Sequence, residues 1–362
     1  MSSAVTDPSA PIPPGSHRRM FPNMIRPAPE RDAAISLRGV EKRFGTTRAV
    51  AGLDLVVPRG SLCGFLGPNG AGKSTTIRMI MSIIYPDSGT VSVLDGTALA
   101  NKDRIGYLPE ERGLYRTMKV SEFLIYIGRL KGLTAASAHR SASEWLERIE
   151  LKGISKKKCQ ELSKGMQQKV QFIASVIHDP ELLILDEPFS GLDPVNAQLL
   201  TSIIKDLNRS GKTIIFSTHQ MHTAEAMCDR VVLINHGIKL LDANLADVRA
   251  QFDPHSLILE PVDESFDIRE ITARVPSITS VEFDDENRLA RLLRVDPALD
   301  PQSVMSDVVR AIPTRSIAIK RPTLTDIFIQ LVEATGGAAP SLSEIGDGAA
   351  AGSTAHREGG SR

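Results

Sequence analysis

The chain has 362 residues, of which 41% are hydrophobic and 24% charged, a composition typical of a globular protein. Lys plus Arg and Asp plus Glu number 43 each, so the zero net charge gives no indication of a nucleic-acid-binding protein. The length predicts about two domains. The three scattered cysteines lack metal-ligand spacing and favour a reducing compartment. No run approaches the ~20 apolar residues of a membrane-spanning helix, so work at a membrane would require a second chain.

Composition divides the chain into two tails and two folded regions. Residues 1–33 are rich in Pro, Ser and Ala, and residues 336–362 in Gly, Ala and Ser, so we expect both tails to be disordered. Residues 34–252 alternate short apolar strands with helices, which predicts an α/β domain with a parallel sheet. A mainly helical subdomain is expected at about residues 115–178. The expected strands are 35–40, 49–57, 61–66, 182–185, 213–217 and 231–235, and the expected helices are 73–84 and 197–208.

Residues 255–335 are predicted to form a small α+β domain. No motif in this region carries recognisable chemistry. Thr323 and Asp326 form a start signal of the capping-box type for the last helix. The expected strands are 256–259, 280–283, 289–295 and 315–319, and the expected helices are 303–311 and 323–334.

A glycine-rich loop follows the strand at 61–66 and fits G-x-x-x-x-G-K-[ST]. Glycines allow backbone N–H groups to surround phosphates, and the following helix directs its positive end at the same anion. Lys73 would neutralise the β- and γ-phosphates, and the Ser74 hydroxyl would bind Mg²⁺. The loop consists of Gly67, Pro68, Asn69, Gly70, Ala71, Gly72, Lys73, Ser74 and Thr75.

A second motif is the apolar strand that ends in Asp186 and Glu187. Downstream of a phosphate loop, Asp186 is expected to hold Mg²⁺ and Glu187 to act as the general base towards water. The two motifs together predict a protein that binds and hydrolyses ATP with Mg²⁺.

In the order and spacing of these motifs, residues 35–250 resemble the nucleotide-binding domain of ABC transporters. Residues 162–169, Leu-Ser-Lys-Gly-Met-Gln-Gln-Lys, resemble the family signature LSGGQ-QQR. The resemblance implies that Ser163 and Gly165 contact the γ-phosphate held by an opposite subunit. Lys164 and Met166 depart from the pattern, which puts the side-chain hydrogen bonds of this segment in doubt.

Four further residues take their expected roles from the resemblance. Phe44 lies where the family places an aromatic that stacks on adenine, and Asp193 belongs to a segment similar to the D-loop at the dimer interface. His219 is similar to the switch histidine at the γ-phosphate. Glu110 stands where the family has the Q-loop glutamine, so an acid replaces an amide. The run 110–115 resembles sodium- or drug-efflux subunits that carry a small C-terminal domain.

The resemblance implies a homodimer of ATPase subunits that sandwiches two ATP molecules and drives an integral-membrane permease on a separate chain, most simply in export. Such a subunit would be cytoplasmic and peripheral on the inner face of the membrane. The transported substrate is not encoded here, because the permease selects it. Three alternatives remain open: a soluble ABC-type ATPase acting on ribosomes or nucleic acid, an importer ATPase, and a binding module without hydrolysis. One phosphate loop, no long heptad run and the intact Asp186, Glu187 and His219 argue against the first and the last.

Overall fold

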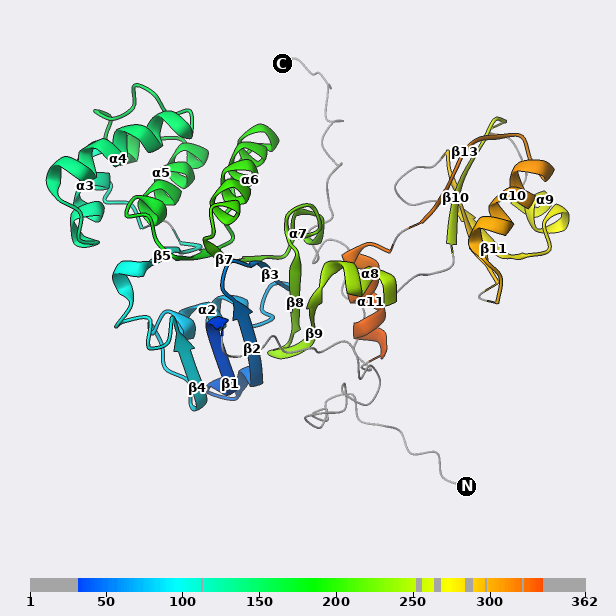
Figure 1. Cartoon of the computed structure of the whole chain (residues 1–362), viewed down its shortest axis with the longest axis horizontal. Coiled ribbons are helices and arrows are strands. Elements are labelled where there is room, and N and C mark those ends of the chain that lie inside the picture. Colours follow the sequence, from blue (N-terminus) through cyan, green and yellow to red (C-terminus); the bar gives the residue numbers. More distant parts are fainter. Residues whose placement is uncertain are drawn as a thin grey trace, which may run out of the picture. The chain divides into compact units, whose positions relative to one another are not determined.

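The computed structural model describes residues 32–111, 113–251, 256–263, 268–283, 289–296, 298–320 and 322–334. The chain forms two compact units, one comprising residues up to Leu245 together with those from Phe328 onward, and the other spanning Ala246–Ile327. The expected tails lie almost wholly outside the described residues, although the first strand already begins at Ala33. Figure 1 labels most of the elements of both units.

The core of the first unit is a six-stranded sheet in the order β5-β6-β7-β3-β8-β9. Neighbouring strands from β5 to β8 are parallel, and β9 joins as an antiparallel edge through the β8–β9 hairpin. All residues of β3 and β6 are buried, as expected for central strands covered on both faces. The strands are β3 (Leu62–Leu66), β5 (Ile105–Leu108), β6 (Leu182–Asp186), β7 (Thr213–Thr218), β8 (Arg230–Asn235) and β9 (Ile238–Asn244).

A separate antiparallel sheet in the order β2-β1-β4 packs its apolar face against α2 and the central sheet to form one core. Its strands are β1 (Ala33–Phe44), β2 (Thr47–Pro58) and β4 (Ser88–Val93). Outside the helical subdomain, the helices of this unit are α2 (Lys73–Ile80), α6 (Pro194–Arg209) and α7 (Met221–Met227), with a short 3-10 turn η2 (Lys102–Arg104). Helix α8 (Leu245–Gln251) begins at the last residue of this unit and belongs otherwise to the second.

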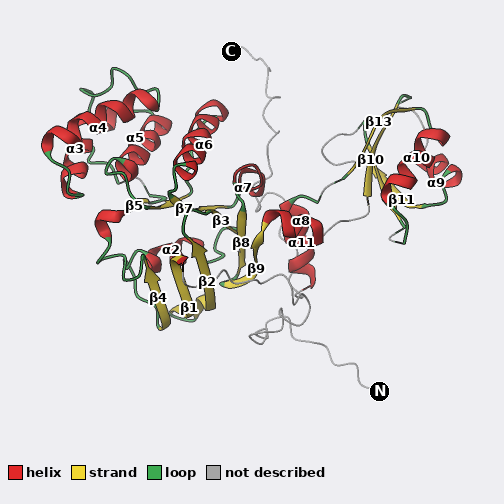
Figure 2. Ribbon diagram, viewed as in Figure 1, coloured by secondary structure: helices red, strands yellow, loops and turns green. Residues whose placement is uncertain are grey.

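Three helices form the subdomain expected at residues 115–178: α3 (Val120–Leu130), α4 (Ala135–Arg148) and α5 (Lys164–Val176), with a 3-10 turn η3 (Cys159–Glu161) before α5. Figure 2 shows them gathered on the β5 side of the sheet, where α5 contacts β5. Side-chain caps fix two of these helix starts, because Thr134 accepts from the Ser137 N–H and Ser163 from the Met166 N–H.

The second unit contains an antiparallel sheet in the order β11-β12-β10-β13, with α9 and α10 packed on one face. Its core is formed by aliphatic side chains of these strands and helices. The elements are β10 (Ser256–Pro261), α9 (Ile268–Arg274), β11 (Ile278–Phe283), β12 (Arg291–Val295), α10 (Pro301–Ala311) and β13 (Thr314–Ile319). Helix α11 (Leu324–Ala334) starts in this unit, and its residues from Phe328 onward belong to the first.

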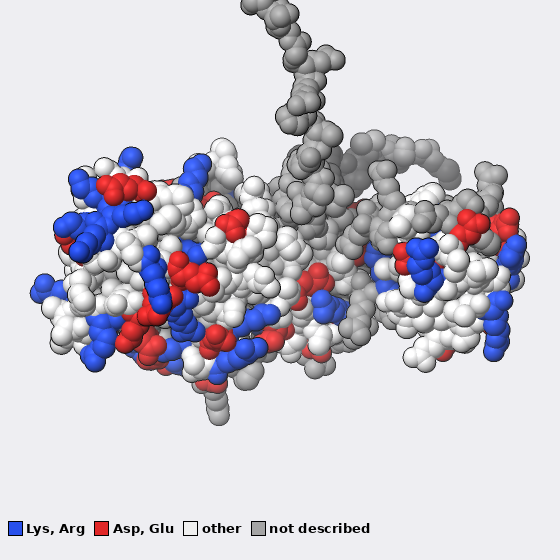
Figure 3. Space-filling model, turned by 90° about the horizontal axis from the view of Figure 1, so that it is seen from above, with Lys and Arg blue, Asp and Glu red and all other residues white. Residues whose placement is uncertain are grey.

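The structure departs from the sequence expectations mainly at boundaries. Helix α2 ends at Ile80 instead of residue 84, because Ser82 adopts a left-handed conformation with φ 56°. Strands β4, β5 and β9 and helices α7, α8 and α9 were not predicted. The second unit starts at Ala246 and ends at Ile327, earlier at both ends than the expected 255–335, because the two divisions between the units fall within α8 and α11. No helix among the described residues is long and apolar enough to cross a membrane. Positive and negative side chains are interspersed over the face seen in Figure 3.

Candidate nucleotide-binding site

The glycine-rich loop lies between β3 and α2, with α2 beginning at Lys73 as predicted. Gly72 adopts a left-handed φ of 102°, and a Cβ on it would lie 2.4 Å from the carbonyl oxygen of Ala49. A Cβ on Gly67 would lie 2.2 Å from the Ile234 carbonyl oxygen. The loop is thus held between β2 and the end of β8 so closely that only glycine fits at these two positions.

The Lys73 ammonium is bound inside its own loop. Its side chain is only 6% exposed, and Nζ donates to the carbonyl oxygens of Gly67, at 2.7 Å, and Pro68, at 3.0 Å. Burial lowers the pKa of Lys73, while the nearby carboxylates of Glu187, Asp186 and Glu110 act in the opposite direction. An arriving phosphate can therefore compete with these carbonyl groups for a positive charge that is already in place.

The hydroxyl of Ser74 lies between two carboxylates, because its Oγ is 3.3 Å from both Glu110 Oε2 and Asp186 Oδ1. Asp186 is 1% exposed, and burial raises its pKa, whereas the hydrogen bonds from Ser217 and Ser74 lower it. A hydroxyl has one proton and can donate to only one of the two oxygens at a time. This group of hard oxygen atoms therefore suits a cation such as Mg²⁺.

Glu187 and His219 form a direct pair at the ends of the neighbouring strands β6 and β7. Glu187 Oε1 lies 2.8 Å from His219 Nδ1 and accepts the His219 backbone N–H at 3.1 Å. Glu187 holds a left-handed φ of 49°, which is uncommon outside glycine and places its carboxylate beyond the strand. The hydrogen bond with Glu187 raises the pKa of His219, and burial acts against it.

The raised pKa of His219 predicts a pH-dependent contribution to stability. The pair stabilises the fold fully below the ordinary histidine pKa of ~6.5, and this contribution is lost as the pH rises through the raised value in the folded state. His219→Gln should therefore reduce the free energy of unfolding more at pH 6 than at pH 9. Urea unfolding at both pH values measures this, and an equal loss at both would contradict the pairing.

One cavity of about 420 Å³ brings most of the predicted phosphate-loop residues together with the carboxylates of Glu110 and Glu187. Residues not predicted from sequence complete its wall: Thr47, Arg48 and Ala49 of β2, and His236 in the β8–β9 turn. From the loop itself the wall includes Asn69, Gly70, Ala71, Gly72, Lys73, Ser74 and Thr75.

Other predicted residues lie elsewhere. Phe44, at the end of β1, is 52% exposed, and Lys42 Nζ lies 5.6 Å from its ring centre. Ser163 caps α5, and Gly165 follows within the first turn of that helix. Asp193 caps α6 by accepting the Asn196 N–H at 3.0 Å. None of these four residues lines the cavity.

Ser217 is a site residue that sequence reasoning did not single out. Its hydroxyl donates to Asp186 Oδ1, and its Oγ accepts the Glu187 N–H at 3.1 Å. Because Asp186 lies opposite Ser217 in the β6–β7 register, one side chain of β7 positions both acidic residues of β6. The signal available in the sequence was its place two residues before His219.

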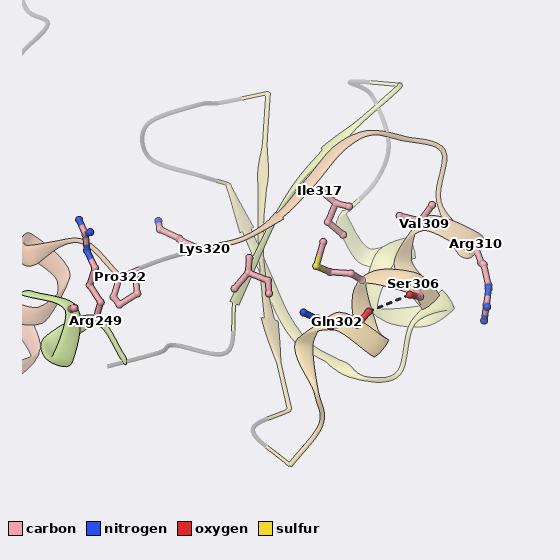
Figure 4. A pocket seen from close by; sticks show the side chains of 11 residues that line it. Arg249, Gln302, Ser306, Val309, Arg310, Ile317, Lys320 and Pro322 are labelled. Carbon is pink, nitrogen blue, oxygen red and sulfur yellow. Dashed lines mark hydrogen bonds between the residues drawn. The ribbon is translucent and has the colours of Figure 1, made fainter. Parts of the chain in front are cut away.

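A larger cavity lies in the second unit beside α10 and β13 (Figure 4). Its wall combines the apolar side chains of Met305, Val309 and Ile317 with Gln302 and Ser306, and the Ser306 hydroxyl donates to the Gln302 carbonyl. None of the predicted site residues lines it, so size alone does not mark the chemical site.

Comparison with known proteins assigns both regions. A family model described as ABC transporter matches residues 50–190, and one described as the C-terminal domain of DrrA1-3-like ATP-binding proteins matches residues 244–332. A solved structure entitled "Structure of ATP binding subunit of ABC transporter" is 30% identical, with a TM-score of 0.57, over 60% of this chain and 93% of that one.

Three relatives extend the likeness. The uncharacterized ABC transporter ATP-binding protein YhaQ of Bacillus subtilis is 39% identical over 303 residues, 83% of this chain and 99% of that protein. The daunorubicin resistance ATP-binding protein DrrA3 of Streptomyces coeruleorubidus is 33% identical over 83% of this chain and 96% of its own. The Nod factor export ATP-binding protein I of Burkholderia lata is 38% identical over 62% of this chain and 73% of that protein. With its phosphate loop, acidic strand end and C-terminal domain, the chain belongs to the ATP-binding subunits of ABC transporters, the ATPases of these systems.

Proposed function

We propose that this chain hydrolyses Mg²⁺-bound ATP in a head-to-tail homodimer and drives an exporter through a separate membrane permease. The observation that carries the proposal is the convergence of Lys73, Ser74 and Glu187 on one pocket, with His219 bonded to Glu187 from behind. Phosphate release by the purified chain tests the activity. ATP hydrolysis should require Mg²⁺ and stop when EDTA is added. The proposal would be contradicted if, with Mg²⁺ present, neither the purified chain nor solubilised membranes that contain it hydrolysed ATP.

Ser74 and Asp186 would hold Mg²⁺, and Glu110 lies close enough to contribute an oxygen. Among the described residues, no three His, Cys, Asp or Glu side chains cluster closely enough to hold a metal alone. Phosphate oxygens of ATP would therefore complete the coordination. When bound, Mg²⁺ neutralises charge on the β- and γ-phosphates.

The remaining chemistry falls to the protein side chains. Lys73 exchanges its carbonyl partners for phosphate oxygens and stabilises the charge of the transferring group. Glu187 accepts the proton of the attacking water, and His219 keeps the Glu187 carboxylate oriented through two contacts to one oxygen. Because all three serve the transfer of one phosphoryl group to water, loss of any one should lower turnover severely.

The position of Ser163 and Gly165 outside the cavity supports the homodimer. Ser163 begins α5, so N–H groups of its first turn can serve an anion brought by another molecule. In a head-to-tail dimer they would close over the ATP in the partner's phosphate loop, and Asp193 would lie at the same interface. Neither subunit alone would then complete a site.

Phe44 is proposed to stack on adenine. Phe44→Ala should weaken ATP binding about 5- to 150-fold, since stacking on an aromatic ring is worth ~1–3 kcal/mol. Because Phe44 is half exposed, the folded state should be little affected. Titration with a fluorescent ATP analogue measures the affinity, and Phe44→Tyr, which retains the ring, is the control. Equal affinity of the alanine variant and wild type would exclude stacking.

The permease is proposed to dock near the loop after β5. Tyr115 and Tyr126 are exposed, and their rings make an edge-to-face contact with centroids 5.7 Å apart. Exposed aromatic residues of this kind are enriched at protein interfaces. The names of the DrrA3 and Nod factor relatives favour export over import. Docking to a permease would place the chain on the inner face of the membrane.

A further inference from the structure

Helix α5 holds two loops through a pair of buried glutamines. Gln171 Nε2 donates to the Glu111 carbonyl oxygen at 3.0 Å, and Gln168 Nε2 donates to the Pro188 carbonyl oxygen at 3.0 Å. The two side chains are 5% and 2% exposed. Both bonds join this helix to loops far from it in the sequence.

The two loops carry the acidic residues of the site. Glu111 follows Glu110, which reaches the Ser74 hydroxyl, and Pro188 follows Glu187. The same helix begins at Ser163, its N-cap. One rigid element therefore connects the segment that would face the partner's ATP with the two carboxylates that face the chain's own ATP.

Gln171 also has an unused acceptor. Its Oε1 is buried and, in the described part of the chain, has no hydrogen-bond partner. A buried acceptor without a donor is costly, so such an atom requires an explanation. The Glu110–Glu111 loop is the segment that the other end of this amide already binds. A second arrangement of the loop, presenting a backbone N–H, would satisfy the oxygen.

We propose that Gln171 is a positioning residue that couples the two ATP sites of the dimer. When Ser163 engages ATP on the partner, α5 shifts, and Gln171 moves the Glu110 loop towards the ATP of its own subunit. Gln168 makes the parallel connection to the Glu187 loop. The inference rests on the proposed head-to-tail dimer, and it adds a path by which ATP in one site prepares the other.

The test uses a dimer in which the observed subunit has no ATP of its own. Isotope-labelled chain carrying Lys73→Ala is mixed with an excess of unlabelled chain carrying Glu187→Gln, and Mg²⁺ and ATP are added. Only the partner's loop can then hold ATP, and the labelled subunit contributes its Ser163. Backbone hydrogen exchange is followed in segments 105–111 and 162–170 of the labelled chain. Size-exclusion chromatography shows whether dimers form.

Addition of ATP should slow exchange about tenfold in both labelled segments. The substitution Gln171→Met in the labelled chain preserves the side-chain volume but removes the hydrogen-bond donor. It should abolish the ATP-dependent slowing of exchange in 105–111 and retain the slowing in 162–170. Gln171→Leu, which also lacks the donor, should behave the same way if the methionine variant folds poorly. Ser175→Ala is the matched control and should respond like the parent, because the Ser175 hydroxyl donates to the Phe172 carbonyl within α5.

A further variant separates the two connections. Exchange is followed in residues 187–192 as well, where ATP should also slow it in the parent. Gln168→Met should remove this response and leave that of 105–111 intact. A full response of 105–111 in dimers carrying Gln171→Met would overturn the coupling and leave the ATPase proposal standing. Failure of the parent pair to form ATP-dependent dimers would overturn the composite site, and the coupling with it.

Discussion

Glu187→Gln is expected to lower the rate of ATP hydrolysis by about 10²–10⁴-fold, since an amide cannot accept the proton of the attacking water. The amide occupies almost the same volume and can keep a contact with His219, so ATP binding should survive. The variant should therefore accumulate as an ATP-bound dimer. Phosphate release measures the first effect, and size-exclusion chromatography with Mg²⁺ and ATP measures the second.

The control for this prediction is Glu111→Gln, which makes the same chemical change one residue beyond Glu110. Its side chain is exposed and pairs with Arg78 at 3.6 Å, away from the pocket. Its turnover should stay close to that of the wild type. Near-normal hydrolysis by Glu187→Gln would mean that another group acts as the base.

Gly72→Ala is expected to abolish ATP binding and to destabilise the first unit. The new Cβ would lie 2.4 Å from the Ala49 carbonyl oxygen, which is a backbone atom that cannot rotate away. The left-handed φ of 102° adds strain of about 1–2 kcal/mol for any residue with a Cβ. Either the loop or β2 must shift, and the phosphate-binding N–H groups would move with it. Nucleotide titration and thermal unfolding measure the two losses.

Gly70→Ala offers a matched control two residues earlier in the same loop. Its φ of 79° is also left-handed, but a Cβ there has no atom within 4 Å. The variant should incur only the conformational cost and retain measurable ATP binding. Equal behaviour of Gly70→Ala and Gly72→Ala would show that the contact with Ala49 is unimportant.

The parts of the site that could be predicted from sequence are those whose geometry is local. The residues from Gly67 to Thr75 are contiguous, and their strand–loop–helix setting follows from local pattern. The pairing of Glu187 with His219 depends on β6 and β7 being parallel neighbours, which periodicity does not determine. The pairing was therefore not predicted: the resemblance to the family gave His219 only a role at the γ-phosphate.

Features that arise from contacts between distant segments were missed, because local sequence patterns do not determine which segments become neighbours. His236 and Thr47 reach the cavity because the β8–β9 turn and β2 close on the phosphate loop, and nothing local to either segment indicates this. Gln171 is seen as a connection only once the Glu111 carbonyl is placed beside it. Helix α9 is short, so its apolar periodicity is weak compared with that of α10.

The central claim is that two subunits share each ATP site, and mixing two inactive variants tests it most directly. Lys73→Ala should inactivate the phosphate loop, and Ser163→Arg should block the signature, so each variant alone should neither hydrolyse ATP nor form ATP-dependent dimers. A mixed dimer contains one intact site, built from the loop of the second variant and the signature of the first. We predict that mixing restores ATP-dependent dimers and ATP hydrolysis. A mixture no more active than its separate components would contradict the composite site.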